Sequence, residues 1–271
     1  MAAAVVLVGG LTTAATTVPE GPSNRAAGVR VALDHAGVQG PVVTVPAGET
    51  VAATVSCPAG REPSGGGGGS DGRGIFIASS AAHGNDWAVE LSNESGGPLR
   101  GAAFVVCTQG AHFRHVGTSV TVPGGGSGTA TATAYCPAGQ LPTGGGFLAD
   151  GTNVFASSMY SDQSNRWFVR VGNDTSFDTS VSAFVLCSPN TQSRRETSVV
   201  LPPGAEETQS VSCPPGEVAA GGGGRSDALG NPGVVISTSR ALPDGHGWSV
   251  RATNRSNTAH TLTAQAICTA F

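Results

Sequence analysis

Six cysteines are the side chains in this sequence best suited to a defined chemistry, because paired thiols either crosslink a chain or bind a metal. Two of them occur in each of three similar segments, at equivalent positions. A structural zinc site usually takes four Cys or His ligands at close spacing, and no C-x-x-C sequence occurs here. One disulfide in each segment is therefore the prediction, with metal binding as the alternative. The predicted pairs are Cys57–Cys107, Cys136–Cys187 and Cys213–Cys268.

Glycine runs follow the first cysteine of each pair, and one of them has the G-x-x-x-x-G spacing of a phosphate-binding loop between Gly60 and Gly65. Such a loop needs a Lys and then Ser or Thr directly afterwards, whereas Gly66 follows here and the chain contains no lysine. We expect instead that the glycines lie where only a backbone without Cβ fits, over the indole of the segment's own tryptophan. Replacing Gly145 with Val is then predicted to destabilise the fold.

Histidine and serine could supply a general base and a nucleophile, but no histidine position is common to the three segments. His112 and His115 form only a weak metal signal, and there is no G-x-S-x-G sequence. We therefore predict no catalytic residue, no cofactor and no metal. The alternative is a secreted hydrolase with a site between repeats. That alternative predicts a polar cluster in one groove between repeats that the other grooves lack.

Polar loops before the three tryptophans hold the candidate ligand residues. Their Asn, Asp and Gly residues are typical of hairpin turns, and a ligand loop is the alternative, with the edge of the tryptophan as a stacking face for a sugar ring. Each tryptophan also begins the apolar face of a strand, which favours a place in the core. The candidate residues are Asp86, Trp87, Asp162, Trp167, Asp244, His246 and Trp248.

These residues belong to a unit that occurs three times with a period of about 80 residues. Each copy has Cys-Pro-x-Gly, a run of glycines, a tryptophan, an asparagine six residues later and a second cysteine after fourteen more. The asparagines are Asn93, Asn173 and Asn254, and each begins an N-x-[ST] sequence. In a eukaryotic secreted chain these would be glycosylation sites; otherwise they predict turns in which Asn and Ser or Thr cap the backbone.

Short alternating apolar runs predict strands throughout, and no segment has a sustained helical period. The fold class is therefore all-β: three homologous antiparallel β-sheet repeats, as small sandwich or prism-like units of five or six strands with one disulfide each. Residues 29–38 are predicted to add a strand to the first unit. The repeats would pack about a pseudo-threefold axis or follow one another as separate beads.

The chain divides into a signal peptide and leader at 1–27 and three β repeats at 28–117, 118–196 and 197–271. Residues 2–11 are apolar but too short to span a bilayer, which is typical of a signal peptide. Because a positive n-region is missing, a misplaced start codon or an uncleaved tail is the alternative. No later segment is apolar enough to be transmembrane.

Charge excludes two classes of partner. Charged residues make up 12% of the chain and the net charge is -4, so there is no basic surface for nucleic acid and no polybasic membrane patch. Secretion and disulfides together predict an extracellular or cell-surface location.

The unit resembles a β module of secreted actinobacterial proteins, which carries the repeated Cys-Pro-x-Gly, GGG, Trp, Asn and Cys pattern. The resemblance covers residues 41–271 and implies a bacterial secreted protein, without an established activity. The third copy departs from the pattern, with Gln265 where the others have Phe104 and Phe184. We predict a non-enzymatic binding, adhesion or structural role, with a glycan or the cell envelope as partner. The sequence predicts neither the ligand nor the oligomeric state.

Overall fold

The computed structural model describes residues 35–126, 128–162, 164–190, 192–228 and 233–270. These residues form twenty β-strands and no helix, so the all-β prediction is confirmed. Ala32–Phe271 form one compact unit. The predicted signal peptide and leader, and most of the predicted extra strand at 29–38, lie outside the described residues. Within the described ranges, nothing helical has the length and apolar character needed to traverse a lipid bilayer.

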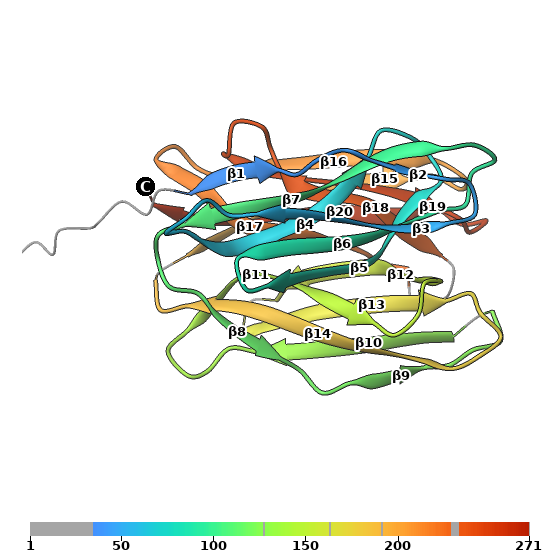
Figure 1. Cartoon of the computed structure of the whole chain (residues 1–271), viewed down its shortest axis with the longest axis horizontal. Coiled ribbons are helices and arrows are strands. Elements are labelled where there is room, and N and C mark those ends of the chain that lie inside the picture. Colours follow the sequence, from blue (N-terminus) through green and yellow to red (C-terminus); the bar gives the residue numbers. More distant parts are fainter. Residues whose placement is uncertain (1–34, 127, 163, 191, 229–232, 271) are drawn as a thin grey trace, which may run out of the picture. The chain divides into compact units, whose positions relative to one another are not determined.

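The strands recur in three sets, which we call repeats 1, 2 and 3 (Figure 1). Repeat 1 holds β1 (Ala36–Gln39), β2 (Val43–Val45), β3 (Thr50–Ser56), β4 (Glu62–Ser70), β5 (Ile75–His83), β6 (Asp86–Asn93) and β7 (Leu99–Thr108). Repeat 2 holds β8 (Phe113–Val116), β9 (Val120–Val122), β10 (Gly128–Tyr135), β11 (Leu141–Ala149), β12 (Val154–Ser161), β13 (Arg166–Asn173) and β14 (Thr179–Ser188). Repeat 3 holds β15 (Ser193–Leu201), β16 (Glu206–Ser212), β17 (Glu217–Ser226), β18 (Val234–Ala241), β19 (Gly247–Asn254) and β20 (His260–Ala270).

The described part of repeats 1 and 2 has seven strands each and that of repeat 3 has six, so the prediction of five or six is wrong for the first two. The difference lies at the start of each set. In repeats 1 and 2 the first segment is broken into two short strands, whereas β15 runs through without a break. β1 is the counterpart of β8 and β15, and is therefore a regular member of its repeat rather than an addition to it.

Each sheet is shared between two repeats. Sheet A has the order β1-β7-β4-β18-β19-β16, sheet B the order β3-β6-β5-β11-β14-β8, and sheet C the order β10-β13-β12-β17-β20-β15. Within each sheet the halves from different repeats are joined through one paired position: Gly68 with Ser239, Ser80 with Phe147, and Met159 with Gly224. No sheet is formed by one repeat alone, so the alternative in which the repeats follow one another as separate beads is wrong. The sharing runs in a cycle, as packing about a pseudo-threefold axis requires.

Glycines allow the strands of different repeats to approach this closely. A Cβ atom on Gly65 would lie 2.7 Å from the Cα of Gly221, and one on Gly144 would lie 2.7 Å from the Cα of Gly65. The three glycine-rich strands β4, β11 and β17 therefore meet where no side chain fits. Ser64 fixes one of these contacts by donating a 2.7 Å hydrogen bond from Oγ to the carbonyl of Ala220.

The neighbouring glycine of each run lies over the tryptophan of its own repeat, as predicted. A Cβ on Gly145 would lie 2.6 Å from Cδ2 of Trp167 and 2.5 Å from the carbonyl oxygen of Phe184. Gly66 and Gly222 have the same relation to their own tryptophans. All three indoles are fully buried. The glycine runs are therefore structural.

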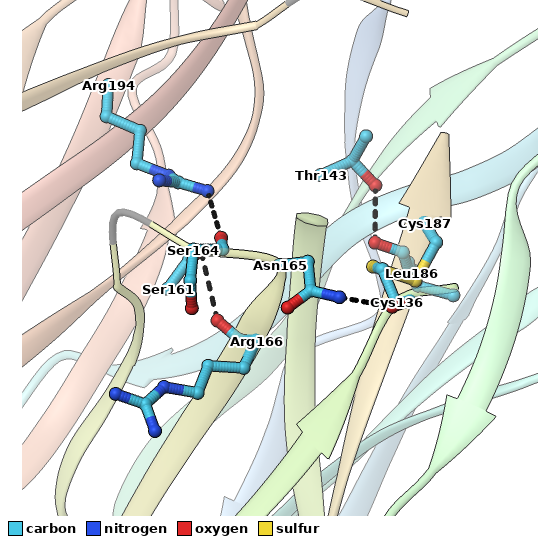
Figure 2. The surroundings of a disulfide bond; sticks show 9 residues. All are labelled: Cys136, Thr143, Ser161, Ser164, Asn165, Arg166, Leu186, Cys187 and Arg194. Carbon is cyan, nitrogen blue, oxygen red and sulfur yellow. Dashed lines mark hydrogen bonds between the residues drawn. A yellow bond between two sulfur atoms is a disulfide. The ribbon is translucent and has the colours of Figure 1, made fainter. Parts of the chain in front are cut away.

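The three predicted disulfides are confirmed, with Cα–Cα distances of 5.6, 5.7 and 5.7 Å. In each repeat the first cysteine directly follows a strand of one sheet and the second lies in a strand of another. Cys136, for example, follows β10 of sheet C and bonds to Cys187 in β14 of sheet B (Figure 2). Each crosslink thus ties together the two sheets to which its repeat contributes, and closing such a loop stabilises by about 4 kcal/mol in the chain-entropy model.

The three asparagines cap turns, as predicted. Oδ1 of Asn93 accepts a 2.8 Å bond from the backbone N–H of Ser95, and Asn173 and Asn254 accept equivalent bonds of 2.9 Å. Each side-chain amide is buried and donates to two backbone carbonyls, one four residues further on and one at the end of a distant strand, β2, β9 or β15. A glycan on any of these amides would replace one of the two N–H donors and so remove at least one of these bonds in the folded protein.

The residues that follow the three asparagines are Glu94, Asp174 and Arg255, and Arg255 contacts the other two. Arg255 forms ion pairs with Glu94 and, at 3.5 Å, with Asp174. Its guanidinium lies 5.3 Å from the ring centroids of both Phe76 and Phe155, which belong to a separate small core where β5, β12 and β18 contact one another. Three equivalent positions therefore carry two acids and one base rather than three like charges.

Candidate functional site

The predicted ligand loops are hairpin turns between β5 and β6, β12 and β13, and β18 and β19. Trp87, Trp167 and Trp248 have no exposed surface, as their predicted place in the core requires, and their edges are not presented to a sugar as the alternative supposed. Each ring packs under a glycine run, and Trp248 also lines the floor of a cavity described below. Asp86 is exposed at the start of β6, where it pairs with His83 across the turn.

The other loop residues hold their own turns together. Asp162 accepts a 3.0 Å bond from the backbone N–H of Ser164 and forms an ion pair with Arg166. Desolvation alone would raise the pKa of the Asp162 carboxyl, but the hydrogen bonds from Ser164 and Arg166 outweigh it and hold the pKa below its usual value. In the third loop Asp244 accepts a 2.9 Å bond from the N–H of His246. These contacts are those of turns, not of a ligand site.

Metal ligands are not brought together in the described ranges, where no group of three His, Cys, Asp or Glu side chains could hold an ion. His115 lies in β8, and His112 just before it contacts the Gly110 carbonyl at 2.7 Å. Burial lowers the pKa of His112, and the neighbouring His35 lowers it further. His115 and His112 thus belong to an edge strand and to the loop before it.

A groove on sheet A is the strongest candidate site. It consists of two adjoining cavities of about 200 and 360 Å³, between β1 and β7 of repeat 1 and β18 and β19 of repeat 3. The first cavity has apolar walls, formed by Val38, Val106, Leu242 and Pro243, with the buried Trp248 beneath them. The second is polar and is lined by Asp71, Arg100, Thr238 and Arg251.

Phe104 and Arg240 stand between the two cavities and line both of them, together with Gln39. Strand alternation turns Phe104 away from its core neighbours Ala103 and Val105, and its ring is half-buried. The guanidinium carbon of Arg240 lies 4.9 Å from the centroid of that ring, a cation–π contact. Among the described residues the Arg240 guanidinium has no hydrogen-bond or ion-pair partner, so its N–H donors are available to a ligand.

The polar cavity is positively charged although the chain as a whole is negative. Arg251 is held by hydrogen bonds of 2.7 and 2.9 Å to the carbonyl and hydroxyl of Ser70, and its Nε lies 3.8 Å from Glu206. Asp71 accepts a 3.1 Å bond from the backbone N–H of Arg100. With Arg240, three guanidinium groups line this cavity beside the Asp71 carboxylate, and Glu206 behind Arg251 offsets part of their charge, in a chain of net charge -4. The arrangement favours an anion.

The corresponding part of sheet B is filled by a side chain that sheet A lacks. Gly37 pairs with Val106, the residue before the second cysteine of repeat 1. In repeat 2 the residue before the second cysteine is Leu186, and its partner is Arg114. Arg114 lies 5.0 Å from the ring centroid of Phe184, which is fully buried where Phe104 is only half-buried. A hollow of about 310 Å³ remains at partly equivalent residues, Ala82, Arg114 and Leu186, but Phe184 does not line it.

Sheet C is filled by a hydrogen-bonded network. Arg194 takes the position of Gly37 and donates a 3.0 Å bond to the carbonyl of Ser164 (Figure 2). Gln265 takes the position of Phe104 and bonds to the backbone N–H and carbonyl of Ser161 at 2.9 and 2.7 Å, and to Glu196 at 2.8 Å. The place beside Phe104, which is open in sheet A, is therefore covered by Arg114 in sheet B and filled by Gln265 and its partners in sheet C.

Sequence reasoning missed Gly37, Phe104 and Arg240 as site residues, because it looked for features shared by the three copies. The useful signal is a difference between the copies at one equivalent position. Position by position, repeat 1 has Gly37 where the other repeats have Arg114 and Arg194. A glycine at a position otherwise held by a large side chain marks a place where a ligand can enter.

The chain matches no protein-family model, and no curated protein is significantly similar to it.

Proposed function

We propose that the protein is an extracellular binding protein that takes its ligand in the groove of sheet A. The observation that carries this proposal is Gly37: of the three equivalent positions, it alone lacks an arginine, and the groove is open beside it. A purely structural role gives no reason for one repeat to leave its groove open. The three disulfides fit an oxidising, non-cytoplasmic compartment, and a glycan or the cell envelope is the expected source of the ligand.

The hydrolase alternative predicts a polar cluster in one groove, and sheet A has such a cluster. Ser70, Asp71 and Arg251, however, are engaged in holding one another or the adjacent backbone. The Ser70 hydroxyl donates to the carbonyl of Gly72 at 2.9 Å and accepts from Arg251, and Asp71 is bonded to the backbone of Arg100. Neither cavity is lined by a histidine or a cysteine that could act as a base or nucleophile. The cluster therefore supports binding better than hydrolysis.

The test is a binding screen with a matched pair of variants. Gly37→Arg places in repeat 1 the side chain that repeats 2 and 3 already have, and a Cβ there meets nothing within 4 Å. Gly96→Arg makes the same change of charge and size at an exposed turn, also in open space, and serves as the control. The proteins are screened against a glycan array and against isolated bacterial cell envelopes.

We expect binding by the wild type and by Gly96→Arg, and loss of binding by Gly37→Arg. Equal binding by all three proteins would show that the ligand surface lies elsewhere on the molecule. The absence of binding in every format would count against a role in recognition and in favour of a structural one.

A further inference from the structure

The two halves of the groove differ enough in chemistry to define the kind of ligand. We infer that the groove binds an amphipathic organic anion, with a ring-sized apolar group in the first cavity and a carboxylate held by Arg240 at the border of the second. This inference rests on the proposed function, because it names the ligand class of the same site.

The first cavity is suited to a ring-sized apolar group. Its volume of about 200 Å³ exceeds the size of about 150 Å³ at which an engineered protein cavity binds benzene. Its polar side chains are those of Gln39 and Arg240, at the border with the second cavity. A sugar buried here would leave most of its hydroxyl groups without a side-chain partner, which is costly. An aromatic or branched aliphatic group has no such requirement.

The border between the cavities is suited to a carboxylate. The guanidinium of Arg240 is held over the Phe104 ring, which orients it without using its N–H donors. Guanidinium groups bind carboxylates through two parallel hydrogen bonds. Arg251 and Arg100 add positive charge on the far side of the second cavity, which Asp71 and Glu206 offset only in part. An anion that reaches Arg240 thus enters a region of favourable potential.

Geometry joins the two halves into one site. Because Phe104, Arg240 and Gln39 line both cavities, a molecule in the first cavity lies directly against the groups that would bind its charge. A short linker between the ring and the carboxylate therefore suffices. 3-Phenylpropionate has these features and is the probe.

The experiment is isothermal titration calorimetry on the disulfide-intact protein with three probes. 3-Phenylpropionate has both the ring and the charge, 3-phenylpropionamide keeps the ring without the charge, and galacturonate keeps the charge on a polar ring. We expect 3-phenylpropionate to bind at least about tenfold more tightly than the amide, since a hydrogen bond to a charged group is worth that much or more. Galacturonate should bind more weakly than 3-phenylpropionate.

Two variants test the two halves separately. Gly37→Arg fills the apolar cavity and should abolish 3-phenylpropionate binding, whereas Gly96→Arg should retain it. Arg240→Ala introduces the residue that repeat 1 has at the equivalent position, Ala81, and should remove the tenfold preference for the acid over the amide. A thermal melt of each variant checks that it folds.

The outcomes separate this inference from the proposed function. If galacturonate binds more tightly than 3-phenylpropionate and Gly37→Arg abolishes its binding, the groove is the site but the ligand class is wrong. Equal affinities for the acid and the amide would overturn the role of Arg240. If no probe, glycan or envelope shows binding that depends on position 37, both the ligand class and the proposed function fail.

Discussion

The buried faces of the three sheets and their outer faces differ in how closely the repeats agree. Inside, every repeat packs a glycine against its own tryptophan and ties two sheets together with a disulfide. Outside, the same backbone position carries Gly37 in one repeat and Arg114 or Arg194 in the others. The three repeats therefore share one packing arrangement in the interior, whereas their outer faces carry different side chains.

This contrast separates the requirements of folding from those of binding. A residue that packs against a neighbouring strand must satisfy the same geometry in every repeat, so it repeats. A residue over a groove meets solvent or a ligand, so the repeats can differ there without a large loss of stability. The predictions below test this separation, beginning with the interior.

The largest effect is expected for Gly145→Val, which tests the repeated interior. The new side chain would meet the Trp167 indole and the Phe184 carbonyl oxygen at about 2.5 Å, so the strands must move apart. We expect the free energy of unfolding to fall by about 3 kcal/mol, measured by denaturant titration. Gly96→Val, at a position with open space, is the control and should change little. Equal stability of the two variants would refute the packing argument.

Arg255→Glu tests the contact between the three turns, where three identical charges would repel one another. It would bring a third carboxylate to Glu94 and Asp174 and remove the cation over Phe76 and Phe155. We expect a loss of about 2 kcal/mol, which decreases as salt screens the repulsion. Arg255→Gln loses the cation without adding repulsion and should be less affected. If both variants are equally stable at low salt, charge does not govern this contact.

Arg114→Gly tests whether one side chain closes the groove of sheet B. Removing it should expose the buried Phe184 and lower the unfolding free energy by about 1–2 kcal/mol, from lost packing, the cation–π contact and the flexibility of glycine. Arg195→Gly controls for the effect of glycine in a strand, because Arg195 is exposed in β15 and follows Arg194, the counterpart of Arg114. The reverse change in sheet A, Gly37→Arg, should alter stability by less than about 0.5 kcal/mol. A large loss there would mean that the open groove is needed for folding.

Glu90→Gln is expected to have the smallest effect, and one that depends on pH. Arg251 and Arg170 take the equivalent positions, so Glu90 is a carboxylate where the other repeats have a base. Burial raises the pKa of Glu90, so the unfolded chain loses its proton first and the native state loses stability as pH rises above about 4.3. The glutamine variant should gain a few tenths of a kcal/mol at pH 7, since solvent screening limits the effect.

Thermal melts of wild type and Glu90→Gln from pH 3 to pH 8 measure this difference. The gain should vanish below about pH 4, where the carboxyl is protonated in both states. A gain that is the same at every pH would assign the effect to packing rather than to charge.

The sequence was sufficient to predict the features that each repeat contains by itself. The disulfides, the buried tryptophans, the asparagine turns and the glycine contacts all follow from spacings within one copy. The sharing of sheets does not, because a strand such as β4 has the same alternation whether it pairs with β5 or with β18. The groove was also missed: Gly37 marks it in the sequence, but its other wall depends on which side chain from a neighbouring repeat lies opposite Phe104.

Chemical-shift mapping with 3-phenylpropionate tests the central claim most directly, because one spectrum contains the amide signals of the groove and of the equivalent positions in the other sheets. The account predicts that the amide signals of Val38, Phe104 and Ala241 shift in proportion to one another as the probe is added. The signals at the equivalent positions in sheet B, His115, Phe184 and Ala82, should stay in place. Shifts of similar size in both grooves, or shifts confined to the hairpin turns, would contradict the claim that one open groove of the three is the binding site.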